Sequence, residues 1–145
     1  MNNMLIAQSG GPTAAINASL SGAIQEAIRS KEIDGVYGAL NGIQGVLAGT
    51  IIDLRSQFPR QEDFSILECT PAMALGSCRF RLPEEDADPA LYQKIDEIFK
   101  RYQISYFFYI GGNDSMDTVD KLFRHFSRTG QDIKVIGIPK TIDND

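Results

Sequence analysis

The feature that most constrains the fold is a nearly continuous apolar run, Ser105–Ile110, which stops abruptly at Gly111-Gly112. Such runs are typical of strands that are covered on both faces of a parallel sheet. Two more apolar runs, Met4–Gln8 and Ile133–Ile138, also end in loops of glycine, proline or polar residues. Weaker strands are predicted at 35–40 and 51–54. The chain is therefore expected to build a sheet whose strands end in polar loops.

Apolar residues at helical spacing separate these strands. One set recurs from Ile16 to Ile28 along a single helical face. A second helix is predicted to begin at Asp88-Pro89, because aspartate is a favoured N-cap and proline fits the first helical position. A third helix follows Gly112, whereas 41–45 is predicted as a turn or one helical turn and 55–87 as loops and short turns. This alternation predicts an α/β fold, a Rossmann-like, doubly wound parallel sheet forming one domain over residues 1–145.

The charge balance limits the partners of this protein. With 14 Lys+Arg against 19 Asp+Glu, the net charge is −5, so most of the surface would repel nucleic acid and anionic membranes, and neither is expected as a partner. Cys69, Cys78 and the single His125 do not have the spacing of a metal site, so we predict reduced thiols and a cytoplasmic location. His125 is expected to be a solvated or half-buried helical residue, and 107–109 to lie in the core.

Three loops are candidates for a ligand site. Ligands of open α/β sheets bind outside the carboxyl ends of the strands, and Ser9–Pro12, Gly111–Ser115 and Pro139–Asp145 all leave strands at that edge. If the strands are parallel, the three loops face one crevice. Gly10-Gly11 precedes a helix whose free N–H groups and positive dipole end favour an anion, although a tight turn without a ligand has the same sequence.

Charged residues in and near these loops suggest phosphate chemistry. Lys140 can offset phosphate charge, and Arg79 can bind a phosphoryl group in a bidentate manner, although a surface arginine is the simpler explanation of its local sequence. Asp143 and Asp145 point in different directions on an extended stretch, which favours one as a proton acceptor and the other near a metal. A solvated turn of asparagine and aspartate is the alternative. The residues alone thus favour Mg²⁺-assisted phosphoryl transfer to a hydroxyl group of a small molecule.

Four motifs follow one another over nearly the whole chain. They are Ser9-Gly10-Gly11-Pro12 with Asn17, Gly76-Ser77-Cys78-Arg79-Phe80, Gly111-Gly112-Asn113-Asp114-Ser115 and Pro139-Lys140-Thr141-Ile142-Asp143-Asn144-Asp145. Together, at these spacings, they resemble the N-terminal part of the phosphofructokinases. The third motif alone would also suit lipid kinases and NAD kinases, whereas the fourth is highly specific.

The resemblance implies transfer of a phosphoryl group to the 1-hydroxyl of fructose 6-phosphate, which gives fructose 1,6-bisphosphate in glycolysis. It implies that Asp143 is the catalytic base and that Lys140 and Thr141 assist it. The implied donor-binding residues are Gly11, Arg79, Gly112, Asp114, Ser115 and Lys140, and the implied substrate-binding residues are Thr141, Asp143 and Asp145. Mg²⁺ is the implied cofactor, with Asn113 and Asp145 as candidate ligands.

Three positions bear on the phosphoryl donor. The ATP-dependent members usually carry glycine where this chain has Asp114, whose side chain would crowd and repel the α-phosphate of a nucleotide. The ammonium of Lys140 stands where many bacterial ATP users have glycine, and it can bind diphosphate. Ile43 stands about where ATP users often have an aromatic residue. This combination is similar to the diphosphate-dependent branch, while Asn113 replaces the commoner aspartate and brings no charge to a metal.

The chain stops at Asp145 on polar loop residues, and chains of the family are much longer. We therefore expect residues 1–145 to be the donor-binding domain of a longer protein, with the substrate domain largely absent, so that this piece alone turns over little. The full-length protein is expected to be a homo-oligomer that uses fructose 6-phosphate and diphosphate. Two alternatives are an ATP-dependent 6-phosphofructokinase and a non-catalytic regulatory subunit of the same fold. The intact 141–145 run argues against the regulatory subunit, which has no need of a catalytic base.

Overall fold

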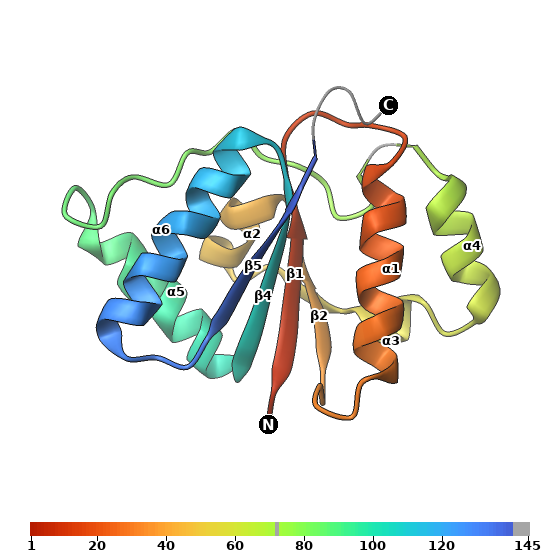
Figure 1. Ribbon diagram of the computed structural model, residues 1–145, viewed down its shortest axis with the longest axis horizontal. Coiled ribbons are helices and arrows are strands. Elements are labelled where there is room, and N and C mark those ends of the chain that lie inside the picture. The colour runs from red at the N-terminus through yellow and green to blue at the C-terminus, as the bar shows by residue number, and fades with distance from the viewer. Residues whose placement is uncertain (72, 141–145) are drawn as a thin grey trace.

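A computed structural model describes residues 1–71 and 73–140 of the chain. In this part, one five-stranded sheet in the order β3-β2-β1-β4-β5 carries helices on both faces (Figure 1). The strands are β1 (Asn3–Gln8), β2 (Val36–Ala39), β3 (Ile51–Asp53), β4 (Ile104–Gly111) and β5 (Lys134–Pro139). The helices are α1 (Ile16–Arg29), α2 (Gly42–Ala48), α3 (Leu54–Gln57), α4 (Gln61–Cys69), α5 (Pro89–Arg101) and α6 (Asn113–Thr129).

The sheet is parallel except at one edge. β1 pairs in parallel with β2 and β4, and β4 pairs in parallel with β5, as predicted. β3 instead runs antiparallel to β2, so the expectation of a wholly parallel sheet was wrong at this strand. A parallel return needs a crossover of about a dozen residues or more, and the 40–50 connection holds only the seven-residue helix α2.

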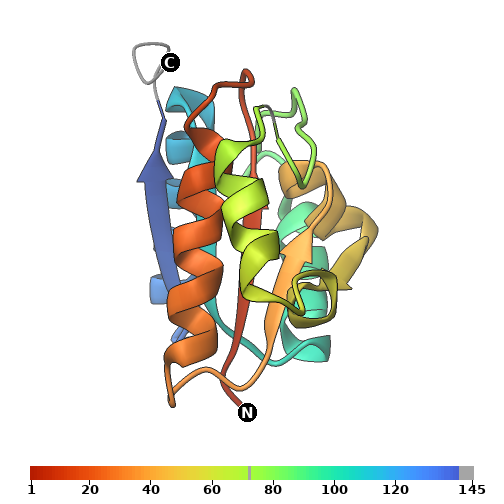
Figure 2. The same cartoon turned by 90° about the vertical axis from the view of Figure 1, so that its right-hand side faces the viewer.

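Side chains of β1 alternate between two apolar layers. Leu5 and Ala7 pack in the layer beneath α2, α5 and α6, whereas Met4 and Ile6 pack in the layer beneath α1, α3 and α4. All four side chains are 0 to 1% exposed, as the central strand of a sheet covered on both faces requires. Figure 2 shows α4 lying beside α1 on the second face, where the two helices are in contact.

Two helices differ from the sequence-based expectation. Segment 41–45, predicted as a turn or a single helical turn, belongs to the longer α2. Part of 55–87, predicted as loops and short turns, forms the four-residue helix α3 and the nine-residue helix α4. Only Phe64 and Leu67 of α4 are buried, and Ile66 is 63% exposed, so the apolar residues show no clear helical period. The carboxylate of Asp63 accepts a hydrogen bond from the Arg60 N–H (2.9 Å) at the start of the helix.

A buried polar network at the end of β1 holds the segment that follows α4. The side-chain oxygen of Gln8 accepts a hydrogen bond from the Leu75 N–H (2.9 Å), and its amide nitrogen donates to Asn17 Oδ1 (3.2 Å). Asn17 Oδ1 also accepts from the Ala74 N–H (2.9 Å). Because buried polar groups need partners, this network fixes residues 74–75 against the start of α1.

The helices that follow β1 and β4 lie on opposite faces of the sheet. β1 leads into α1, which packs in one apolar layer, and β4 leads into α6, which packs in the other. The connections therefore diverge at the carboxyl ends of two adjacent strands (Figure 1). In open α/β sheets this divergence leaves a crevice, which is where ligands bind.

Candidate functional site

A cleft of about 970 Å³ opens at this divergence. It brings together the loops after β1 and β4, the residue after β5 and the segment that follows α4. The lining residues are Ser9, Gly10, Gly11, Pro12, Ser77, Cys78, Arg79, Phe80, Arg81, Tyr109, Gly112, Asn113, Asp114, Ser115 and Lys140. The prediction that three loops share one crevice is thus confirmed for their described residues.

Gly10 and Gly11 allow the first loop to approach its neighbours closely. Gly10 has φ +89°, a left-handed conformation that glycine adopts without strain. A Cβ atom on Gly10 would lie 3.4 Å from the Gly112 backbone nitrogen and 3.6 Å from Lys140 Nζ. The three loops therefore contact one another at their tips, with little space for a larger residue between them.

Lys140 carries a positive charge into the wall of the cleft. Its side chain is buried, with 9% of the residue exposed, and its Nζ donates a hydrogen bond to the Gly11 carbonyl oxygen over 2.6 Å. Its backbone N–H donates to the Gly111 carbonyl oxygen over 2.8 Å, which continues the β4–β5 pairing by one residue. The ammonium is thereby held against the Gly10-Gly11 loop, where it can attract an anion.

The N-terminus of α6 points its first N–H groups toward the cleft. Gly112 is the N-cap residue and has no side chain, so no side chain satisfies these groups. Asp114 lies in the first turn, where a carboxylate stabilises the positive end of the helix dipole. Asn113 and Asp114 are exposed and Ser115 is buried. The helix end therefore combines backbone donors for an anion with one carboxylate that opposes it.

Residues 77–81 form another part of the cleft wall. The Ser77 hydroxyl donates to the Gly10 carbonyl oxygen (2.8 Å), and the Ser9 hydroxyl donates to the Cys78 carbonyl oxygen (3.2 Å). Arg79 and Arg81 are both exposed and line the cleft. The cleft is therefore lined by the cationic side chains of Arg79 and Arg81 as well as Lys140.

Tyr109 reaches the cleft from β4 and is a site residue that the sequence did not reveal. The residue was assigned to the core with its neighbours, and it is indeed only 1% exposed. Its hydroxyl oxygen accepts a hydrogen bond from the Ile43 N–H (3.2 Å), and the side chain lines the cleft beside Cys78. Burial raises the pKa of Tyr109 to about 12, so the phenol keeps its proton at neutral pH. In the sequence, the only sign of this role is that a tyrosine follows Phe107 and Phe108 near the end of the predicted strand.

Some of the other residues singled out in the sequence line the cleft, and others do not. The cleft collects Gly11, Arg79, Gly112, Asn113, Asp114, Ser115 and Lys140, whereas Thr141, Asp143 and Asp145 lie outside the described residues. Cys69 and Cys78 are free thiols, as predicted. Ile43, which was considered as a donor-side residue, is fully buried in the core.

The expectation of a solvated or half-buried His125 was wrong. The residue is 4% exposed, because it packs between α5 and the 84–88 segment. Its Nε2 lies 2.9 Å from Asp96 Oδ1, and its Nδ1 lies 3.0 Å from Glu85 Oε1. It lies outside the cleft lining.

Two kinds of feature do not occur in the described residues. No helix there is long and apolar enough to cross a membrane. Likewise, residues 1–71 and 73–140 contain no group of three or more histidine, cysteine, aspartate or glutamate side chains placed to hold a metal ion.

Comparisons with known proteins show what this chain is similar to. A family profile described as Phosphofructokinase matches residues 3–145. A curated pyrophosphate–fructose 6-phosphate 1-phosphotransferase of Halomonas elongata is 41% identical over 145 residues, covering 99% of this chain and 34% of the relative. The crystal structure of a pyrophosphate-dependent phosphofructokinase from Nitrosospira multiformis superposes with a TM-score of 0.89 at 41% identity, covering 99% of this chain and 35% of that one.

ATP-dependent relatives are less similar to this chain. An ATP-dependent 6-phosphofructokinase of Coxiella burnetii is 28% identical over 147 residues, covering 40% of its length. The chain spans about a third of the length of the first curated relatives that it matches.

Proposed function

Because the chain belongs to the phosphofructokinase family, we propose that the whole protein transfers a phosphoryl group from diphosphate to the 1-hydroxyl of fructose 6-phosphate. The observation that carries this proposal is the pair Lys140 and Asp114 in the lining of one cleft. The ammonium of Lys140 can bind a diphosphate, whereas the carboxylate of Asp114 disfavours the additional phosphate of a nucleotide. The 41% identity to a relative named for pyrophosphate, against 28% to one named for ATP, supports the same donor.

The cleft supplies the charge stabilisation that phosphoryl transfer needs. The transferred group carries negative charge on its oxygens, and preorganised donors stabilise it in the transition state. Lys140, the first turn of α6 and Arg79 all line the cleft. In the proposed reaction the 1-hydroxyl oxygen attacks one phosphorus of diphosphate, the bond to the bridging oxygen breaks, and phosphate leaves. Asp143 accepts the hydroxyl proton, and Thr141 and Asp145 contact the sugar.

We also propose that Mg²⁺ accompanies the diphosphate. Magnesium takes oxygen ligands and is commonly bound by one or two carboxylates together with substrate phosphates. Asn113 places an amide oxygen in the exposed first turn of α6, and Asp145 is a further candidate. These groups fit an ion that is held largely by the diphosphate, and such an ion would offset the charge of the donor.

The donor is tested by a direct comparison on the full-length protein. Fructose 6-phosphate and Mg²⁺ are held at fixed concentrations, and diphosphate and ATP are titrated separately while fructose 1,6-bisphosphate is measured. The proposal expects turnover with diphosphate and none with ATP. Turnover with ATP alone would overturn the argument from Lys140 and Asp114 while leaving the family unchanged. If neither diphosphate nor ATP supported turnover, the result would favour a non-catalytic regulatory subunit instead.

Other properties of the full-length protein follow from the proposal. The reaction belongs to glycolysis and can run in either direction, so phosphate and fructose 1,6-bisphosphate should also form diphosphate and fructose 6-phosphate. The free thiols Cys69 and Cys78 suit a cytoplasmic location. A homo-oligomer is the proposed assembly, which light scattering of the full-length protein would test.

A further inference from the structure

The segment 77–83 carries both arginines of the cleft, yet no sheet or helix holds it in place. In the described part of the chain, no backbone–backbone hydrogen bond joins this segment to the rest of the protein. Side-chain donors take that role at both ends. Ser77 and Ser9 make the two hydrogen bonds at the cleft described above. At the other end, Lys121 Nζ donates to the Leu82 carbonyl oxygen (2.9 Å) and the Tyr92 hydroxyl donates to the Pro83 carbonyl oxygen (2.7 Å).

Lys121 is a buried cation whose partners fix its position. Its side chain, on α6, is only 6% exposed. Besides the Leu82 carbonyl, its Nζ contacts Asp117 Oδ2 at 2.6 Å and Glu84 Oε1 at 3.7 Å. Asp117 Oδ2 also lies 3.7 Å from Arg81 Nε. A buried ammonium is costly unless such partners are present, so the Lys121 side chain has little freedom to move away from Leu82.

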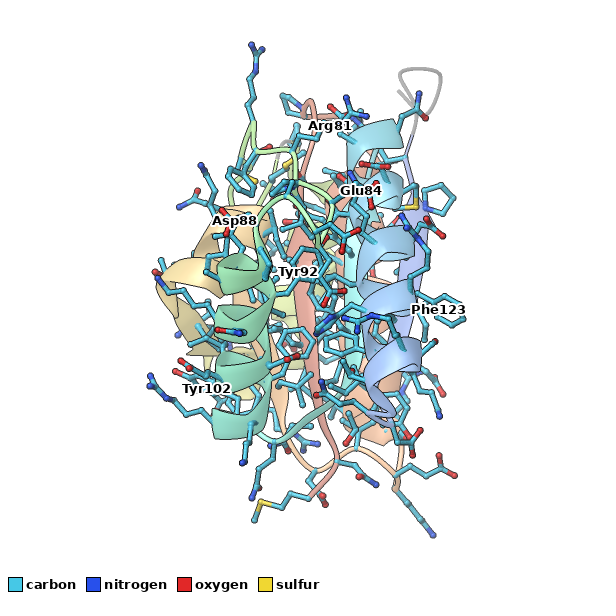
Figure 3. All side chains as sticks on the ribbon, turned by 90° about the vertical axis from the view of Figure 1, so that its left-hand side faces the viewer. Arg81, Glu84, Asp88, Tyr92, Tyr102 and Phe123 are labelled. Carbon is cyan, nitrogen blue, oxygen red and sulfur yellow. The ribbon has the colours of Figure 1, made fainter. Side chains whose placement is uncertain are left out.

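Tyr92 makes the second contact from the opposite helix. The residue lies on α5 and is 1% exposed, and its ring packs against His125 with the ring centroids 5.1 Å apart. Burial raises the pKa of Tyr92 to about 12, so the hydroxyl remains a donor at neutral pH. Figure 3 shows Tyr92 between α5 and α6, with Glu84 and Arg81 above it. Arg81 lines the cleft.

We propose that Lys121 and Tyr92 are positioning residues for Arg79. Helices α6 and α5 donate hydrogen bonds to two successive carbonyl oxygens, of Leu82 and Pro83, and so hold the segment that brings Arg79 to the cleft. The Leu82 side chain is 0% exposed, which anchors the segment at the same point. This inference rests on the proposed function, because it takes Arg79 to bind the diphosphate.

Kinetics of the full-length protein test the inference. Tyr92→Phe removes one hydroxyl and keeps the ring, so the KM for diphosphate should rise about three- to tenfold. Lys121→Met removes a buried charge with three partners, so the rise should be tenfold or more. In both variants the KM for fructose 6-phosphate should stay within about twofold of the wild type. Lys94→Met, which replaces an exposed lysine of α5, is the matched control and should change neither value.

A readout independent of catalysis uses trypsin, which cleaves after arginine. If Lys121 and Tyr92 hold the segment, cleavage after Arg79 or Arg81 should be faster in both variants than in the wild type and the control. Unchanged cleavage, or an unchanged KM for diphosphate in folded Tyr92→Phe, would overturn the inference. An equal loss of affinity for both substrates would also overturn it, because that indicates general destabilisation. A wild-type protein that does not use diphosphate would instead disprove the proposed function. The cleavage rates would still show whether Lys121 and Tyr92 hold the segment in place.

Discussion

Lys140 Nζ donates a hydrogen bond to the Gly11 carbonyl oxygen over 2.6 Å, across 129 residues of sequence. This bond joins the loop after β1 to the residue after β5 and closes one wall of the cleft. An ammonium has three N–H groups, so a bond to one carbonyl is compatible with further bonds to an anion. The positive charge of the cleft is thus held in place by the fold before a ligand arrives.

The donor preference should depend on Asp114 and Lys140. Asp114→Gly combined with Lys140→Gly is expected to admit ATP and to lower kcat/KM for diphosphate tenfold or more, because a hydrogen bond to a charged group contributes about 1.5–3 kcal/mol. Steady-state kinetics with each donor would measure this. Asp120→Gly, at an exposed position of the same helix, controls for the low helix propensity of glycine. If the double variant kept the wild-type donor preference, these two residues would not determine it.

Asp143→Asn should separate catalysis from binding. Loss of a general base lowers rates by about 10²- to 10⁴-fold, so kcat should fall by that factor. Calorimetric titration should show that the affinity for diphosphate changes only slightly, because the base does not contact the donor in the proposed reaction. A variant with unchanged kcat would contradict the role of Asp143 as the base.

Gly111→Ala should destabilise the protein at the cleft. A Cβ atom on Gly111 would lie 2.1 Å from Ser115 Oγ and 2.9 Å from the Ser9 carbonyl oxygen. Relief requires that the first turn of α6 shift away from the end of β4, and overpacking of this kind costs about 1–3 kcal/mol. Gly22→Ala is the matched control, since a Cβ there meets nothing within 4 Å and alanine stabilises a helix interior by about 0.5–1 kcal/mol. Urea denaturation of both variants should give free energies of unfolding that differ from the wild type in opposite directions.

The free energy of unfolding should decrease at high pH because the pKa values of two buried tyrosines are raised in the folded protein. Burial raises the pKa of both Tyr92 and Tyr109 to about 12, above the ordinary value near 10. The unfolded chain therefore loses these protons at lower pH than the folded protein, so the free energy of unfolding decreases from about pH 10 to pH 12. Denaturation curves across this range should show the decrease, and it should be smaller in Tyr92→Phe and Tyr109→Phe. An equally steep decrease in both variants would contradict this assignment.

Much of the fold could be predicted because its signals are local. The apolar run before Gly111 predicted a buried parallel strand, and the helical spacing from Ile16 to Ile28 predicted α1. Helix α4 was missed because only Phe64 and Leu67 of its nine residues are buried. His125 was misjudged because its burial depends on Glu85 and Asp96, which the chain brings to it from other segments.

The sequence by itself determined where the strands end and which loops carry glycine and charge, because backbone conformation and burial periodicity depend on neighbouring residues. It thereby predicted that Gly11, Asp114 and Lys140 would share a cleft. Only the tertiary structure decided that β3 runs antiparallel, that Tyr109 lines the cleft, and that Lys121 donates a hydrogen bond to the Leu82 carbonyl oxygen. These depend on contacts between residues far apart in the chain, whose partners are chosen by packing and by the need to satisfy buried polar groups.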